Sequence, residues 1–171
     1  MNILADAVGS TLGPRSRNVA VDKAPGQDIP PVVLHDGVSV AKAINLPDVH
    51  EDMGVRLLKG ASMKTNEIAG DGTTTSTIIA QALISEAFKN IAAGTNPMKL
   101  KAEIEEASKK VIIELKKMAK PIKTDEEMEQ VASISAADPV IGKLIAEAIK
   151  KIGKDGIISV EDGTGFETTV T

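Results

Sequence analysis

The segment with the most potential chemistry is a glycine-flanked aspartate followed by three threonines: Gly70, Asp71, Gly72, Thr73, Thr74 and Thr75. It directly precedes an apolar pattern with helical spacing, so the threonines open a predicted helix. The unpaired N–H groups of a first helical turn favour an anion, and threonine hydroxyls add donors. A carboxylate there would repel bare phosphate unless a divalent cation bridges the two. The segment therefore predicts a phosphate cradle in which Asp71 holds a metal.

A plain helix cap is the alternative interpretation of the same segment. Aspartate and threonine are ordinary N-cap residues, so Asp71 or Thr73 could serve only to begin the helix. Capping explains one such residue but not the whole run. The sequence contains no GxxxxGK[ST] pattern, which excludes a conventional P-loop. The residues alone leave the cradle and the cap both open.

A second candidate site lies near the start of the chain, where Thr11 and Leu12 precede Gly13 and Pro14. Glycine lets a backbone approach a ligand closely, and the Gly-Pro pair also ends a helix. A helix stop is the favoured interpretation when this segment is taken alone.

Asp36 is a third candidate, because it precedes Gly37 and a short apolar helical pattern. An aspartate in this place is an ordinary N-cap or turn residue unless its carboxylate faces the same pocket as the threonines. The neighbouring His35 is either a donor to phosphate or simply a residue at the end of a strand.

The elements that must position these residues are mostly helices. Apolar periodicity and glycine or proline stops predict four helices, over residues 2–12, 38–44, 48–69 and 73–93. Capping residues mark the beginnings of three more helices. One runs from Asn96 and Pro97 to before Pro121, one from Thr124 with Glu127 to about 134, and one from Asp138 and Pro139 to 152. Two short strands at 18–22 and 32–34, around a turn at 24–27, predict a hairpin. A strand is predicted at 157–160, before a loop at 161–163, and it has no visible partner.

Composition excludes several classes of protein. The 171 residues include no cysteine, so disulfides, thiolate nucleophiles and cysteine-based zinc sites are absent. The two histidines are isolated. There is no tryptophan or tyrosine and the net charge is −4, so we expect no nucleic-acid partner. No apolar run approaches the roughly 18 residues of a membrane span, so we expect no membrane partner.

Six segments, in order and over nearly the whole chain, resemble the N-terminal part of a group I chaperonin, the GroEL family. They are TLGPRSRNVAVDK, DGVSVAKAI, AGDGTTTSTIIAQALI, AAGTNPMKLK, GKLIAEAI and GKDGIISVEDGTG. The AAGTNPM segment is similar to the group I pattern and unlike that of group II chaperonins.

The resemblance implies a mainly α fold: a helical equatorial domain with a small β-hairpin, plus a partial α/β intermediate domain. Residues 1–117 would be the N-terminal part of the ATP-binding equatorial domain, and residues 118–171 the first segment of the intermediate domain. The apical domain and the rest of the equatorial domain, with part of the ATP site, would be absent from this chain.

The resemblance also implies roles for the candidate residues, with ATP and magnesium as cofactors. Asp36 would help the hydrolytic step, and Asp71 would hold the magnesium ion. The residues that would bind the nucleotide are Thr11, Leu12, Gly13, Pro14, Asp71, Gly72, Thr73, Thr74 and Thr75. The family usually has lysine where this chain has His35, so an imidazole takes the place of the lysine ammonium group.

The implied function is that of an ATP-dependent chaperone that assists the folding of non-native proteins inside a ring. The expected partners are client polypeptides, a co-chaperonin lid and identical subunits in a double ring, with the hairpin at 18–35 reaching a neighbouring subunit. The expected compartment is the bacterial cytoplasm, and an organelle is the alternative. The segment alone is expected to hydrolyse ATP poorly or not at all. The competing interpretation is a non-catalytic helical module that binds an anion or a nucleotide.

Overall fold

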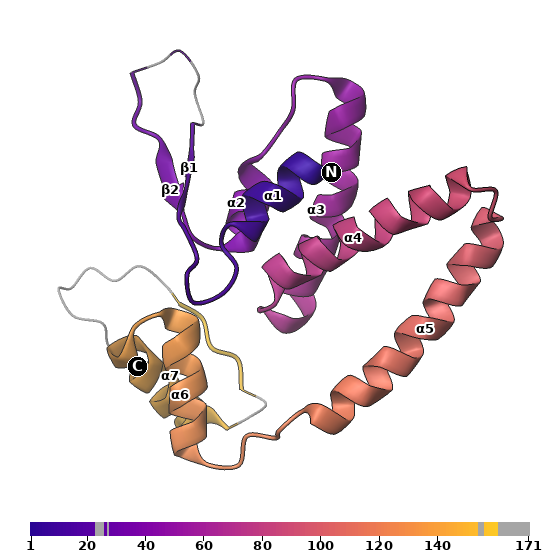
Figure 1. The fold of residues 1–171 in the computed structure, drawn as a ribbon. Coiled ribbons are helices and arrows are strands. Elements are labelled where there is room, and N and C mark those ends of the chain that lie inside the picture. The colour runs from indigo at the N-terminus through magenta and orange to yellow at the C-terminus, as the bar shows by residue number, and fades with distance from the viewer. Residues whose placement is uncertain (23–25, 27, 154–155, 161–171) are drawn as a thin grey trace. The chain divides into compact units, whose positions relative to one another are not determined.

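The computed structural model describes residues 1–22, 26, 28–153 and 156–160. Within these residues it contains seven helices and one small antiparallel sheet (Figure 1). The elements are α1 (Asn2–Gly9), β1 (Val19–Val21), β2 (Val32–Leu34), α2 (Gly37–Ala43), α3 (Val49–Ala69), α4 (Thr73–Ala92), α5 (Pro97–Met118), α6 (Asp125–Ala136) and α7 (Pro139–Ile152). The predicted mainly α fold with a small hairpin is confirmed.

The chain divides into two compact units, Met1–Glu106 and Ala107–Thr171. The division falls within α5, which belongs partly to each unit. The domain boundary expected between residues 117 and 118 stays a prediction.

The core of the first unit is entirely aliphatic, because the sequence has no tryptophan or tyrosine and Phe88 is exposed. Seven buried residues from α1, α2 and α3 form it: Leu4, Ala5, Val8, Val40, Ala41, Val55 and Leu58. Burial of each large aliphatic side chain contributes about 1.5–3 kcal/mol. Helix α3 also packs against α4, and α1 contacts α4 as well. This arrangement brings the end of α1, the beginning of α2 and the end of α3 towards the beginning of α4.

The hairpin has the predicted strands in antiparallel register, with Val19 opposite Leu34 and Val21 opposite Val32. Val19 and Leu34 are partly buried against the aliphatic core, which anchors the base of the hairpin to the helices. Except for Gly26, the predicted turn at 24–27 lies outside the described residues.

The first helix ends earlier than predicted, at Gly9 instead of Leu12. The chain leaves the α-helix through tighter bonds: the amide of Thr11 donates to Val8 O at 3.0 Å, and that of Leu12 donates to Gly9 O at 3.1 Å. Such three-residue bonds commonly satisfy the last carbonyls of a helix. Thr11 therefore lies in a turn, where its side chain can face another element.

Capping side chains lie at the N-termini of the later helices, at the residues that the sequence predicts. Asn96 Oδ1 accepts from the Met98 amide at 2.9 Å, and Asp138 Oδ1 accepts from the Val140 amide at 2.7 Å. Thr124 and Glu127 form a reciprocal capping box, each side chain accepting from the other's amide at 3.2 Å. These predictions succeed because each cap depends only on residues within one helical turn.

Replacing Thr124 with alanine removes the hydroxyl that caps α6. We expect T124A to lower the free energy of unfolding by about 1 kcal/mol, the usual effect of losing such a cap. Urea denaturation of the full-length protein measures it. Thr124→Ser keeps the acceptor and is the control, so equal losses in both variants would contradict the capping role.

The capping box also has a pH dependence with a definite sign. Hydrogen bonds from the amides of Lys123 and then Thr124 lower the pKa of the Glu127 carboxyl. A carboxyl whose pKa is lowered by folding stabilises the protein above its unfolded pKa of about 4.3. That contribution is lost as the pH falls through the lower folded value.

Among its described residues, the second unit contains the C-terminal part of α5 and two packed helices, α6 and α7, which are joined at Ala137 in the left-handed conformation (φ 53°). Gly142 of α7 lies so close to Ser133 of α6 that a Cβ at position 142 would overlap the Ser133 backbone. Lys150 Nζ, near the end of α7, pairs with Asp125 Oδ2 at the start of α6 at 2.6 Å. The two helices therefore run antiparallel.

The strand predicted at 157–160 is wrong, because the described residues 156–160 form no strand. A strand needs a neighbour to bond its backbone donors and acceptors, and the described part of this unit offers only helices. Within the described residues of this range, the elements that represent the expected α/β segment are the helices α6 and α7. The predicted loop at 161–163 lies outside the described residues.

The long helix α5 has the charged surface that the sequence predicts. Ion pairs of the i,i+4 type join Lys99 to Glu103 and Lys101 to Glu105, each at 3.8 Å. No residue of α5 is buried within the described chain. None of the helices in the described ranges combines the length and apolar character needed to cross a membrane.

Candidate functional site

The candidate site is built around a turn of two left-handed glycines between α3 and α4. Gly70 (φ 69°) caps α3 and Gly72 (φ 77°) precedes α4, a conformation that side chains rarely adopt. Between them, Asp71 is exposed, and its Oδ1 accepts from the Gly72 amide at 2.7 Å. The glycines therefore let the chain reverse sharply and present a carboxylate beside the beginning of α4.

The beginning of α4 has no side-chain cap among the described residues. Neither Asp71 nor Thr73 caps the first turn, because the N-cap residue is Gly72 and the Asp71 carboxylate bonds to the amide of that glycine. The interpretation in which the side chain of Asp71 or Thr73 caps this helix is therefore wrong. The N–H groups of the first turn are left for another acceptor, which is the condition that anion binding requires.

The turn after α1 meets the beginning of α4 through a pair of hydroxyls. Thr11 Oγ1 lies 3.1 Å from Thr74 Oγ1, and Thr11 also donates to Val8 O at 2.7 Å. A hydroxyl carries a single proton, and the proton of Thr11 is already donated to Val8 O. Thr74 is therefore the donor of the bond between the two threonines.

The beginning of α2 meets Thr74 as well, through Gly37. This glycine is buried, and a Cβ placed on it would lie 3.1 Å from the Thr74 amide nitrogen and overlap Thr74 Oγ1. Only a residue without a side chain allows this approach. The turn after α1 and the beginning of α2, which are distant in sequence from α4, thus both meet it at Thr74.

Asp36 is the N-cap of α2, as one of the two sequence interpretations held. One carboxylate oxygen, Oδ2, accepts from the Ser39 amide at 3.1 Å and from the Ser39 hydroxyl at 3.0 Å. The carboxylate is also exposed and adjoins Gly37. Capping α2 and facing the beginning of α4 are therefore compatible roles for this residue.

For the other candidate residues, the structure gives the backbone conformation and the exposure. Leu12, Gly13 and Pro14 follow Thr11 in an exposed turn, with Gly13 in the left-handed conformation (φ 80°). Thr75 is exposed, whereas only 5% of the Thr73 surface is exposed. The roles expected for these residues stay predictions.

The sequence reasoning missed the close approach of Gly37 to Thr74 and the burial of Lys59. One available signal was the glycine at the first position of a helix. Glycine weakens a helix, so its presence there indicates that another segment approaches the backbone closely. A lysine beside the apolar stripe of α3 was the other, and this lysine proves to be buried.

The residues present suit a magnesium-bound polyphosphate better than a metal held by protein alone. Within the described part of the chain, no three histidine, aspartate or glutamate side chains gather into a metal site. Magnesium is usually held by one or two carboxylates together with the phosphates of a substrate. Asp71 beside an uncapped helix start offers that combination.

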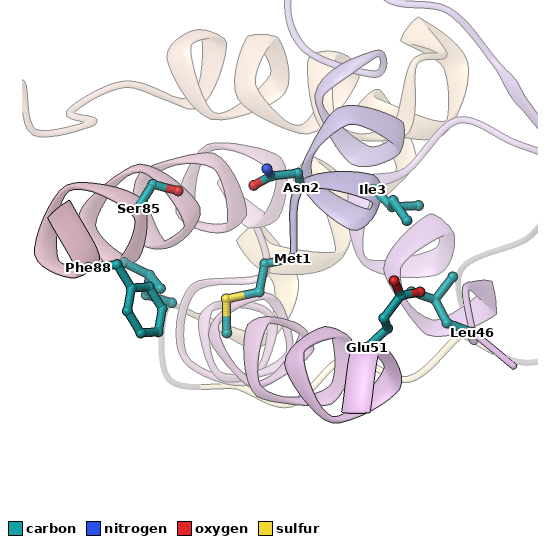
Figure 2. A pocket seen from close by; sticks show the side chains of 8 residues that line it. Met1, Asn2, Ile3, Leu46, Glu51, Ser85 and Phe88 are labelled. Carbon is teal, nitrogen blue, oxygen red and sulfur yellow. The ribbon is translucent and has the colours of Figure 1, made fainter. Parts of the chain in front are cut away.

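A separate hollow lies away from these residues in the first unit (Figure 2). It is lined by the beginning of α1, the loop before α3, and parts of α3 and α4, with Met1, Leu46 and Phe88 supplying apolar surface. Glu51 is the acidic side chain on its wall. None of the candidate nucleotide-binding residues lines it.

Comparison with known proteins identifies a family. Residues 4–168 match the model of the TCP-1/cpn60 chaperonin family. The structure is similar to a group III chaperonin in the open state, with a TM-score of 0.66 and 22% identity, covering 87% of this chain and 29% of that one. It is also similar to the chaperonin gp146 from the bacteriophage EL 2 (Pseudomonas aeruginosa) in the presence of ATP-BeFx, with a TM-score of 0.72 and 26% identity, covering 97% of this chain and 29% of that one.

The chain thus spans 29% of the length of each of these chaperonins. The narrower assignment to group I stays a prediction, because the structural relatives include a group III protein. The family match covers almost the whole chain, and the fold agrees with it. The chain belongs to the TCP-1/cpn60 chaperonin family.

Proposed function

We propose that this chain is the N-terminal part of an ATP-dependent chaperone, in which it contributes one side of the magnesium-nucleotide site. The observation that carries the proposal is the convergence of Thr11, Gly37 and Thr74 at an uncapped helix start beside Asp71. The similar phage chaperonin was solved in the presence of ATP-BeFx, which supports nucleotide as the ligand.

Each element has a distinct task in this proposal. The amides of the first turn of α4, that of Thr74 among them, and the Thr75 hydroxyl would bind phosphate oxygens, and Asp71 would hold magnesium. The metal supplies charge stabilisation to the transferring phosphate group. Asp36 orients the attacking water, and the turn at Leu12, Gly13 and Pro14 covers the nucleotide.

The proposed whole protein couples hydrolysis to the folding of non-native polypeptides. Its subunits form a double ring of identical chains and engage a co-chaperonin lid. We place it in the bacterial cytoplasm, with an organelle as the alternative. These properties are proposed for the full-length protein, because the chain spans only 29% of the chaperonins it resembles.

Nucleotide binding by the full-length protein tests the proposal. ATP with magnesium at 100 times the dissociation constant should stabilise the folded protein by about 2.7 kcal/mol, a clear rise in the melting temperature. Steady hydrolysis of ATP and light scattering typical of a large ring should accompany it. A small particle that binds the nucleotide without hydrolysis would instead support the non-catalytic module, and no thermal shift would contradict both.

A further inference from the structure

A buried lysine of α3 holds the C-terminal end of α2. Only 9% of the surface of Lys59 is exposed. Its Nζ donates to the backbone oxygen of Lys42 at 3.2 Å and to Asn45 Oδ1 at 3.1 Å. Lysine is almost never this buried unless it is paired. These bonds identify its partners as the last turn of α2 and the loop that follows.

The location suits a positive charge. The last carbonyls of a helix have no partner within it, and a cation near them is favourable. The chain leaves α2 at Ile44 in an extended conformation (φ −82°, ψ 123°), so the backbone itself supplies no left-handed cap. The ammonium group of Lys59 satisfies the Lys42 carbonyl in its place.

A neighbouring negative charge favours the protonated form of this lysine. Burial lowers the pKa of Lys59, and the negative charge of Asp52 opposes that change. Asp52 in turn accepts from the Leu46 amide at 3.1 Å and pairs with Arg56 at 3.1 Å. The connection between α2 and α3 is therefore fastened to α3 at several points.

The opposite end of α2 carries the residues of the candidate site. Asp36 caps that end and Gly37 contacts Thr74. With seven residues, α2 is about 10 Å long. A helix this short moves as one body, and Figure 1 shows it beside α3. Restraint at its C-terminal end therefore fixes where its N-terminal end lies.

We propose that Lys59 is a positioning residue, which holds the short helix α2 so that Asp36 stays beside the beginning of α4. Lys59 does not touch the nucleotide in this arrangement, and it acts through Asp36. The catalytic part of the inference rests on the proposed ATPase function. The structural part concerns α2 alone.

Amide hydrogen exchange of the full-length protein tests the structural part. In Lys59→Met, the Ser39 and Val40 amides, which bond to Asp36 at 3.1 and 3.0 Å, should exchange about tenfold faster, because α2 opens more often. Amides of α4 near Thr77 should be unchanged. Asn45→Ala removes one partner of Lys59 and should produce a smaller change in the same direction, which keeps the test available if Lys59→Met folds poorly.

ATP hydrolysis tests the catalytic part. Lys59→Met should lower kcat by about tenfold or more and leave KM within about twofold, because misplacing a catalytic group affects the chemical step more than binding. Lys59→Arg retains the charge and donors and should restore most of kcat. Lys109→Met, an exposed lysine of α5, removes the same charge and should leave kcat unchanged.

The outcomes separate this inference from the proposed function. Unchanged exchange at Ser39 and Val40 would overturn it, as would an equal increase throughout the first unit. An unchanged kcat alongside faster exchange would also overturn it. If the unmodified protein binds and hydrolyses no ATP, the proposed function fails, and the exchange result alone decides whether Lys59 positions α2.

Discussion

Asp71→Asn in the full-length protein should lower kcat for ATP hydrolysis by about 100-fold or more. The substitution removes the negative charge that would hold magnesium, and a bound metal contributes several kcal/mol to charge stabilisation in such reactions. Each 1.4 kcal/mol or so corresponds to a factor of ten in rate. Steady-state hydrolysis over a range of magnesium concentrations measures the loss.

Asparagine at position 71 preserves the local structure while removing the charge. The side-chain oxygen of the amide would still accept from the Gly72 N–H, as the Asp71 carboxylate does at 2.7 Å, so the glycine turn should keep its shape. The melting temperature without nucleotide should therefore stay within about 2 °C, since surface substitutions rarely change stability by more than about 0.5 kcal/mol. Full activity in D71N would contradict the role of Asp71 as the metal ligand.

Gly37→Ala should separate the beginning of α2 from the beginning of α4. The added Cβ overlaps Thr74 Oγ1 and lies 3.1 Å from the Thr74 amide nitrogen, which is part of the backbone and cannot turn aside. Overpacking of this kind costs about 1–3 kcal/mol of stability. We expect chemical denaturation to show that loss and calorimetry to show weaker binding of magnesium-ATP.

Gly60→Ala is the matched control, because it adds the same methyl group to another helical glycine. No atom lies within 4 Å of a Cβ at position 60 outside the local helix. Alanine in an open helical position stabilises a protein by about 0.5–1 kcal/mol relative to glycine. If G37A and G60A change stability in the same direction, the close contact with Thr74 has no energetic importance.

Local features of this fold were predictable from the sequence. The caps at Asn96, Thr124 and Asp138 were each identified from residues within one turn, and the structure contains all of them. The helix opening at Thr73 was likewise predictable from its glycines and apolar periodicity. Such features depend on short-range chemistry, which a linear sequence displays directly.

Features that depend on distant partners were not predictable from single segments. The contact of Gly37 with Thr74 and the bonds of Lys59 join separate helices, and no spacing within one helix indicates them. The strand predicted at 157–160 failed for the related reason that strand formation depends on a neighbour. The resemblance to chaperonins identified Thr11 and Thr74 for the same site, and the structure shows their direct contact.

The uncapped start of α4 has a consequence for engineering this protein. Five other helices begin with an Asp, Asn or Thr cap, and each such cap is worth about 1 kcal/mol. Position 72 cannot gain such a cap by simple substitution, because Gly72 has the left-handed conformation (φ 77°), in which any side chain is strained. Variants selected for heat resistance would therefore gain their stability elsewhere in the chain, and the amides that open α4 would stay available to a ligand.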